Sequence, residues 1–225
     1  MKYMLDTIDK EEIRTGIRTM PISGVTSNPS IIKKFGKIDF FDWFNSLREI
    51  LGPQRSLHIQ VTAPTADGMF REAETIQEKI GAQTYIKVPV NEAGLEAIKR
   101  MKKAEIPVTA TGIYTRTQAF MALEAGADYL AMYYNRMESL DIDAFAVFSA
   151  TARMIDRYKY NAEILGASFK NITQVNRAFE AGAQAVTVAP ALLKDALRLP
   201  MISQCVDTFA SDWRSLYGDV SISDL

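Results

Sequence analysis

The chain has 225 residues, of which 48% are hydrophobic and 24% are charged, and its net charge is −1. This composition is typical of a folded globular protein and excludes disordered and fibrous classes. Because the two signs of charge balance, no overall field attracts the protein to nucleic acid or to an anionic membrane. The first twelve residues carry six charges, so we expect no signal peptide, no membrane span and a cytoplasmic location.

The single histidine and the single cysteine restrict the chemistry further. Catalytic zinc sites usually take two or three imidazoles from the chain, so His58 alone argues against one. No acidic run has the spacing of a magnesium or calcium site. We therefore predict no metal and no cofactor. Cys205 has no partner for an intramolecular disulfide, and we expect it to be a small buried apolar side chain.

Eight short runs rich in β-branched and apolar residues follow one another along the chain. Their first residues lie about 26 positions apart on average, which leaves room for a strand, a helix and two short loops in each unit. The predicted strands are 3–7, 24–28, 57–61, 84–90, 107–112, 129–134, 162–169 and 185–189.

Helical patterns separate these runs. The segments 92–104 and 115–125 carry apolar residues at helical spacing, and Gly126 follows the second as a C-cap. No linker divides the chain, and the glycine fingerprint of an open dinucleotide-binding sheet is missing. We therefore predict one (β/α)₈ barrel domain over 1–225 with an additional C-terminal helix over 200–218.

That C-terminal helix carries the aromatic residues Phe209 and Trp213, which are not needed to close a barrel. Packing in the core is the first expectation for these two rings. Exchange onto a neighbouring subunit is the alternative.

Lys87 is the most informative residue of the predicted barrel. It lies between Ile86 and Val88, whose side chains we expect to face the surrounding helices, so Lys87 faces the barrel axis. Burial favours the neutral amine, which is the form that attacks a ketone to give a Schiff base. The alternative role is a structural ion pair.

Polar residues also end most of the other predicted strands, and in barrels of this kind the strand ends carry the chemistry. Each has an alternative role. Asp6 is also placed to cap a helix, and the segment 26–30 to form a turn before Pro29. Tyr133 is also placed to pack in the core. Buried polar groups without partners are costly, so their number favours a polar ligand. The candidates are Asp6, Thr26, Asn28, Gln60, Thr109, Thr111, Tyr133 and Ser168.

An anion site is indicated near the last strands. Arg136 follows the sixth strand, and Ser168 and Lys170 follow the seventh, where barrels often bind phosphate. Solvated surface charge is the alternative for Arg136 and Lys170.

Four ordered segments resemble the small transaldolase family, which includes the fructose-6-phosphate aldolases. They are GVTSNPS at 24–30, YIKVPV at 85–90, AMYYNR at 131–136 and GASFK at 166–170, and the resemblance extends to Asp212 and Trp213. It implies a metal-free Schiff-base mechanism on a phosphorylated sugar, with Lys87 as the Schiff-base lysine. It also implies a homo-oligomer, a pentamer-based decamer in which the last helix holds its neighbour.

The resemblance assigns roles to the other candidates. Asp6 corresponds to a residue that transfers protons during carbon–carbon cleavage, and Thr26 and Asn28 correspond to residues that hold substrate hydroxyls. Ser168 and Arg136 correspond to phosphate ligands, while Lys170 stands where relatives often have arginine and so lacks the bidentate fork. Thr109 remains a substrate-contact candidate from its strand position alone.

Two positions distinguish the subfamilies. The transaldolases have glutamate on the third strand and phenylalanine on the sixth, whereas the aldolases have glutamine and tyrosine, as this chain does at Gln60 and Tyr133. Tyr133 is then a proton donor to the enamine, and Gln60 and Thr111 hold the catalytic water.

The predicted reaction is the reversible cleavage of fructose 6-phosphate to dihydroxyacetone and glyceraldehyde 3-phosphate. The alternatives are a transaldolase that moves dihydroxyacetone from sedoheptulose 7-phosphate to glyceraldehyde 3-phosphate, and a sugar-phosphate-binding barrel without catalysis.

Overall fold

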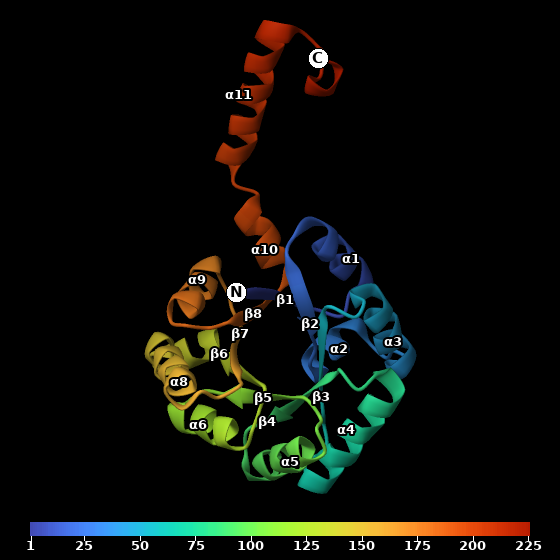
Figure 1. The fold of residues 1–225 in the computed structure, drawn as a ribbon, viewed down its shortest axis with the longest axis vertical. Helices are drawn as coiled ribbons and strands as arrows, with labels where there is room; N and C mark the ends of the chain where they lie inside the picture. The colour runs from blue at the N-terminus through green and yellow to red at the C-terminus, as the bar shows by residue number, and fades with distance from the viewer. The chain divides into compact units, whose positions relative to one another are not determined.

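The eight predicted strand segments all form strands. In the computed structural model, which describes residues 1–225, eight parallel strands close into a barrel in chain order (Figure 1). This confirms the predicted (β/α)₈ fold. The strands are β1 (Lys2–Asp6), β2 (Ile22–Thr26), β3 (Ser56–Gln60), β4 (Tyr85–Pro89), β5 (Val108–Ile113), β6 (Tyr129–Tyr133), β7 (Glu163–Ala167) and β8 (Ala185–Val188).

Nine helices cover the outside of this barrel (Figure 1). Most of them bury one face and expose the other, as the helical spacing of their apolar residues predicts. They are α1 (Lys10–Thr19), α2 (Pro29–Phe35), α3 (Phe40–Leu51), α4 (Ala66–Ile80), α5 (Glu92–Lys103), α6 (Arg116–Glu124), α7 (Tyr134–Glu138), α8 (Ala144–Tyr158) and α9 (Ile172–Glu180).

Side-chain caps fix where these helices begin. An Asp, Asn or Thr side chain accepts a hydrogen bond from the first turn of every one of them except α7. Such a cap contributes about 1 kcal/mol. Asn28 is the cap of α2, which explains why β2 ends at Thr26 rather than at the predicted position 28. Asp9, not Asp6, caps α1, so the capping alternative for Asp6 is wrong.

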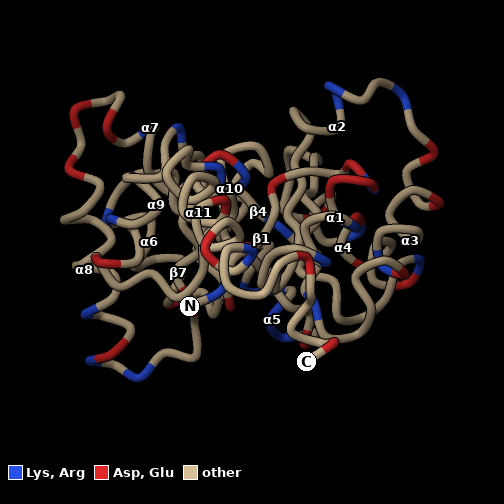
Figure 2. The backbone as a smooth tube through the Cα atoms, turned by 90° about the horizontal axis from the view of Figure 1, so that it is seen from above, with Lys and Arg blue, Asp and Glu red and all other residues tan.

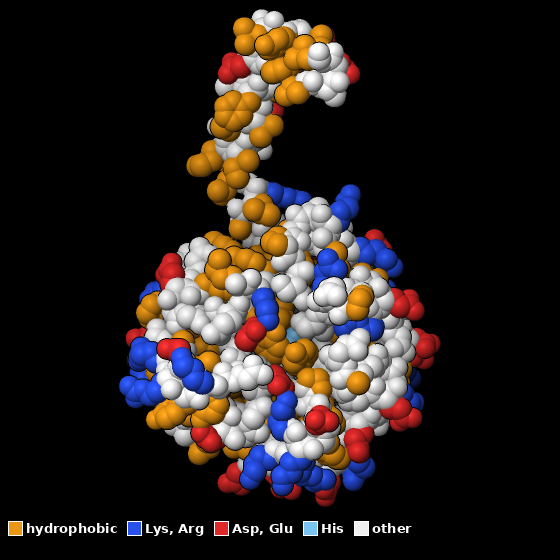
Figure 3. Space-filling view, viewed as in Figure 1, with side chains coloured by type: hydrophobic (Ala, Val, Ile, Leu, Met, Phe, Trp, Pro, Cys, Tyr) orange, Lys and Arg blue, Asp and Glu red, His pale blue; other side chains and the backbone are white.

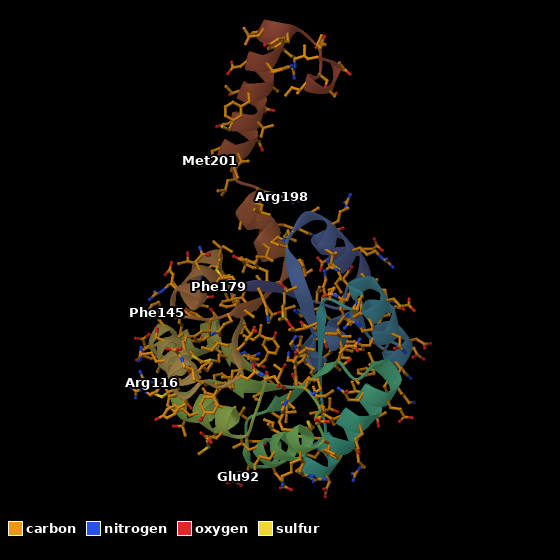
Figure 4. The ribbon with its side chains drawn as sticks, viewed as in Figure 1. Glu92, Arg116, Phe145, Phe179, Arg198 and Met201 are labelled. Atoms are coloured by element: carbon orange, nitrogen blue, oxygen red, sulfur yellow. The ribbon has the colours of Figure 1, made fainter.

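The core has two layers, as strand alternation requires. Outward side chains such as Ile86 and Val88 are fully buried beneath the helices. The helices also contact one another and the strands through aromatic rings. Phe179 of α9 meets the edge of Tyr3 with centroids 5.2 Å apart, and Phe145 of α8 lies under Arg177 of α9 (Figure 4).

Charges of both signs are interspersed over the outer helices, for example α3 and α8 (Figure 2). No helix of the structure combines the length and apolar character needed to cross a membrane.

The chain divides into two compact units, residues 1–190 and 191–225. The second contains most of α10 (Pro190–Leu197), all of α11 (Pro200–Tyr217) and a short 3₁₀ helix (Ile222–Asp224). The helix predicted over 200–218 is therefore present as α11.

The core packing predicted first for this second unit is wrong, and so is the burial predicted for Cys205. No residue of α11 is buried, and its apolar side chains are visible on the surface in Figure 3. Cys205 is exposed rather than buried, and Phe209 is 65% exposed. Trp213 stacks on Tyr217 and donates a hydrogen bond to the backbone oxygen of Val220 at 2.7 Å. An apolar helical stripe predicts a contact surface, but it does not specify what covers that surface.

Candidate active site

A cavity of about 300 Å³ opens where the strands end at the carboxyl side of the barrel. Seven of the predicted site residues line it, from six different strands or the segments that follow them. They are Asp6, Asn28, Gln60, Lys87, Tyr133, Arg136 and Ser168. Three larger hollows, of about 460, 520 and 390 Å³, lie beside α3 and α4, at the amino ends of the strands, and beside α5 and α6. The chemistry of the lining therefore identifies this site better than its size does.

Lys87 reaches this cavity from β4 and is 4% exposed. Its register partners on the two neighbouring strands are Gln60 and Thr109. The six ion pairs of the protein all involve other residues, so the ion-pair alternative for Lys87 is wrong. Its Nζ donates a hydrogen bond to the backbone oxygen of Ser27 at 2.7 Å.

The electrostatic surroundings of Lys87 favour the neutral amine. Burial lowers its pKa below the ordinary lysine value, and the nearby Asp6 carboxylate opposes this shift. A lysine that loses its proton more easily is a better nucleophile at neutral pH, because only the free amine attacks a carbonyl.

Ser27, which the sequence did not single out as a site residue, fixes the carbonyl that receives this bond. It is fully buried, and both its amide and its hydroxyl donate to the backbone oxygen of His58 on β3. The acceptor for Lys87 is therefore held rigidly by the backbone rather than by a mobile side chain.

Asp6 is held by hydroxyl groups rather than by a cation. The Thr26 hydroxyl donates to Asp6 Oδ1 at 2.7 Å, and the Thr187 hydroxyl lies 2.6 Å from that of Thr26. If Thr26 donates to the carboxylate, Thr187 donates to Thr26 in turn. Thr26 is fully buried and does not line the cavity, so it contacts Asp6 instead of reaching a ligand in it.

Thr187 is a second residue that the sequence analysis missed. It lines the cavity from β8, the one strand to which no polar candidate was assigned. The signal was present in its position: Thr187 alternates with the outward Val186 and Val188, so it faces the axis.

Tyr133 is the last residue of β6 and lines the cavity. The hydroxyl lies 3.0 Å from that of Thr111, and the Arg136 guanidinium sits 4.7 Å from the ring centre. Burial raises the pKa of Tyr133, although the Thr111 hydrogen bond and the Arg136 charge act against it. The phenol is thus protonated at neutral pH and can donate a proton. Thr111 does not line the cavity and contacts it through Tyr133.

The β6 and β7 side of the cavity offers groups for an anion. Arg136 of α7 lines it and donates to the Tyr114 hydroxyl at 3.1 Å, a hydrogen bond that raises the pKa of Arg136. Ser168 lines it with φ of 61°, a left-handed conformation unusual for a residue other than glycine. Two donors, one of them a permanent cation, fit a phosphate group here.

Besides Thr26 and Thr111, two further predicted residues do not line the cavity. Lys170 is exposed, and its backbone amide bonds to Gln174 while its side chain is absent from the lining. Thr109 is fully buried, and its hydroxyl lies 2.8 Å from Nδ1 of His58. Asn28 does both things considered for it, since it caps α2 and lines the cavity.

The structure holds no group of three or more His, Cys, Asp or Glu side chains arranged to bind a metal ion. The chemical groups that do meet in the cavity are an amine, a carboxylate, a phenol, an amide and a guanidinium. Together with the closed barrel, they define a (β/α)₈ protein equipped for amine chemistry on a carbonyl compound that carries an anionic group.

The chain belongs to the transaldolase/fructose-6-phosphate aldolase family, a family of enzymes whose model matches residues 3–220. A probable fructose-6-phosphate aldolase of Streptococcus pneumoniae is 46% identical over 99% of this chain and 100% of its own. Probable transaldolases from two strains of Streptococcus agalactiae are each 33% identical over 96% of this chain and 98% of theirs. The resemblance predicted from the four sequence segments is thereby confirmed.

Among solved structures, two forms of a flavocytochrome b2 double variant, with sulfite and with pyruvate bound, superimpose with a TM-score of 0.58. Their sequence identity to this chain is 10%, and the match covers 84% of this chain and 56% of theirs. This likeness supports the barrel fold alone.

Proposed function

We propose that this enzyme reversibly cleaves fructose 6-phosphate to dihydroxyacetone and glyceraldehyde 3-phosphate through a Schiff base on Lys87. The observation that carries the proposal is a lysine 4% exposed and without an ion-pair partner, in one cavity with Tyr133. The 46% identity to a probable fructose-6-phosphate aldolase supports the same choice.

The first half of the reaction uses Lys87 and Asp6. The free amine attacks the C2 carbonyl, and the carbinolamine loses water to give an iminium ion. Asp6 then accepts the proton of the C4 hydroxyl as the C3–C4 bond breaks, and its electrons flow into the iminium to form an enamine. Glyceraldehyde 3-phosphate leaves. In this proposal Arg136 and Ser168, which both line the cavity, hold its phosphate.

The second half uses Tyr133. The enamine carbon C3 takes a proton from the phenol, directly or through a water, and the resulting iminium is hydrolysed to dihydroxyacetone and free Lys87. In this proposal Gln60 and Thr111 orient that water. Thr111 also aligns the phenol through the 3.0 Å contact between the two hydroxyls. Water adds and leaves once each, and the proton that Asp6 took returns to the phenol through solvent.

Product release with and without an acceptor aldehyde tests the proposal. We expect dihydroxyacetone to accumulate from fructose 6-phosphate alone, and borohydride treatment with dihydroxyacetone to add mass only to the peptide that contains Lys87. Turnover that requires an acceptor would favour the second candidate, a transaldolase, which the names of the two 33% identical relatives support. No adduct and no turnover would favour a binding protein.

We also propose that the enzyme is a homo-oligomer, a pentamer-based decamer in which α11 packs on a neighbouring subunit. The exposure of Met201, Val206 and Phe209 on a helix with no buried residue supports this. Analytical ultracentrifugation tests it, with the mass of ten chains expected for the wild type and a smaller assembly for Phe209→Glu. A monomer at micromolar concentration would contradict it.

A further inference from the structure

A polar layer lies inside the barrel beneath the catalytic cavity, on the side of the strand beginnings. Its centre is His58 of β3, which is 0% exposed and uses both ring nitrogens. Nδ1 lies 2.8 Å from the Thr109 hydroxyl, and Nε2 lies 2.9 Å from the Ser56 hydroxyl. The imidazole stacks on Tyr85 at 4.7 Å and meets Tyr129 edge-on at 5.1 Å.

This layer is costly for a barrel, whose interior is usually filled by branched aliphatic side chains. A buried imidazole that loses a hydrogen-bond partner destabilises the fold, because its nitrogen is then left with neither water nor a protein group to bond. The layer packs directly against apolar side chains, because its ring Tyr129 clusters with Met4, Ala131, Leu165 and Ala185, and Tyr85 packs against this cluster. His58 and its two hydroxyl partners therefore lie in largely apolar surroundings.

Strand register places the hydrogen bond between His58 and Thr109 directly below Lys87. Lys87 on β4 has Thr109 as its register partner on β5, and His58 on β3 has Tyr85, two residues before Lys87, as its partner on β4. The bond thus runs from β3 to β5 across β4, between the levels of Tyr85 and Lys87. It engages the one hydroxyl that stands next to the lysine on the neighbouring strand.

The ring is neutral in this position. Burial lowers the pKa of His58 to about 3, and the positive charges of Lys87 and Lys2 act in the same direction. The other titratable groups around it are the phenols of Tyr85 and Tyr129, with Glu163 reached through Lys2. A neutral imidazole donates through one nitrogen and accepts through the other, so it satisfies two hydroxyls without adding a charge under the lysine.

We propose that His58 is a positioning residue that holds the Thr109 hydroxyl away from Lys87 and so keeps the amine in its reactive, uncharged form. If the bond is lost, the buried hydroxyl needs another partner, which is either Lys87 itself or an entering water. Both accept a hydrogen bond from an ammonium group and favour the charged lysine. The role deepens the proposed function, since it concerns the nucleophile of that reaction.

The test measures Lys87 directly and needs no substrate. Trace acetylation of the full-length protein by acetic anhydride at a series of pH values, followed by peptide mass spectrometry, gives the pH midpoint at which Lys87 becomes nucleophilic. His58→Phe keeps the ring and its stacking but makes neither hydrogen bond. We expect it to raise the midpoint by about one pH unit. The double variant His58→Phe, Thr109→Val removes the freed hydroxyl too, and we expect its midpoint to return to that of the wild type.

Two further variants separate this role from a purely structural one. His58→Gln retains one donor and one acceptor, so we expect it to rescue the wild-type midpoint. Tyr85→Phe disturbs the same layer without removing a hydrogen bond to His58, and its midpoint should not move. A fall in melting temperature in His58→Phe with an unchanged Lys87 midpoint would overturn the proposal, as would an equal rise in the double variant.

A measurement on the wild type does not depend on whether a variant folds. The chain has a single histidine, so its ring ¹⁵N signals are assigned without ambiguity. We expect one neutral tautomer across about pH 5 to 9, and a ring that titrates in this range would refute the positioning role. Absence of cleavage together with a low, His58-dependent Lys87 midpoint would refute the proposed reaction but not this inference.

Discussion

Lys87 and Lys2 stand toward opposite ends of the same barrel and show how surroundings decide what a lysine does. Lys2 begins β1, and its Nζ contacts Glu163 at 2.6 Å and the Tyr129 hydroxyl at 3.2 Å. Partial burial alone would lower the pKa of Lys2, but these two hydrogen bonds raise it above the ordinary value. Lys87 has no such partner, and its pKa is lowered. The hollow beside Lys2 is the larger one, yet only the cavity at Lys87 contains an amine suited to covalent chemistry.

The sharpest way to break this comparison is to remove each lysine in turn. We expect Lys87→Met to reduce cleavage by about 10⁴-fold or more and to abolish borohydride trapping, because loss of a covalent nucleophile typically costs this much. Lys2→Met is the matched control, with kcat expected within about twofold of the wild type. Steady-state kinetics check both. Equal losses in the two variants would mean that Lys87 has no special role.

The charges of both lysines act on His58, which is neutral in the folded protein. We therefore expect the free energy of unfolding to depend on pH in acid. The imidazole of the unfolded chain takes up a proton near the ordinary histidine pKa of 6.5, whereas that of the folded protein does so only near a pKa of about 3. The unfolded state therefore binds more protons in this window, and the free energy of unfolding falls by about 1.4 kcal/mol for each pH unit below 6.5.

Urea unfolding between about pH 4 and pH 7 measures this slope, with His58→Gln as the variant that lacks the group. We expect the wild type to lose stability more steeply than the variant as the pH falls. Parallel slopes would show that His58 is already charged in the folded protein.

Tyr133→Phe tests whether the phenol donates the proton that the enamine on Lys87 needs for the release of dihydroxyacetone. The variant lacks the hydroxyl that contacts Thr111, and we expect cleavage to free dihydroxyacetone to fall by about 10²-fold. Transfer to an added acceptor aldehyde should fall less, since the acceptor replaces the proton at the enamine carbon. Progress curves with and without acceptor measure both.

The neighbouring Tyr134 supplies the control for this variant. Its hydroxyl is buried without a partner, and its ring packs against Phe148 and Phe169, outside the cavity lining. Tyr134→Phe should leave both activities unchanged. A similar loss in the two variants would point to damaged packing rather than to a missing proton donor.

The sequence predicted the barrel and the identity of the lysine for a physical reason. Alternation along one strand is a local property, so Ile86 and Val88 on either side of Lys87 were enough to turn its side chain inward. Height along the barrel axis is not local. It depends on the stagger between strands, which is why Thr109 was expected in the cavity and lies instead below it against His58.

Two other differences have the same kind of origin. Thr187 was missed because β8 is a short strand without an ionisable residue that would mark it as a candidate for the site. The alternation of side chains along β8 does predict that Thr187 faces the barrel axis. Lys170 follows the end of β7 in a loop, where strand alternation no longer fixes the direction of a side chain. The position of a residue just after a strand end predicts that it lies near the cavity. Whether its side chain reaches the cavity depends on the conformation of the loop.

The smallest expected effect concerns the stability of the Lys2 end in alkali. The pKa of Lys2 is raised, so its ion pair with Glu163 stabilises the folded protein below the ordinary lysine pKa of 10.5, and this contribution is lost as the pH rises through the folded value. Its side chain is 42% exposed, so the pair is worth only about 0–1 kcal/mol. Lys87 has the opposite sign: the unfolded chain binds the proton more tightly, so its contribution to stability increases as the pH rises toward 10.5.

Urea unfolding of the wild type, Lys2→Met and Lys87→Met between about pH 8 and pH 11 separates the two signs. We expect the stability difference between wild type and Lys2→Met to stay constant up to the ordinary lysine pKa of 10.5 and to shrink above it, because the variant never had the ion pair. Over the same range, the free energy of unfolding of the wild type should rise relative to that of Lys87→Met. The reason is that the cost of burying the ammonium group disappears as that group loses its proton. If the stability difference from the wild type changed with pH in the same direction for both variants, the two lysines would share one electrostatic environment. The contrast between the two ends of the barrel would then rest on geometry alone.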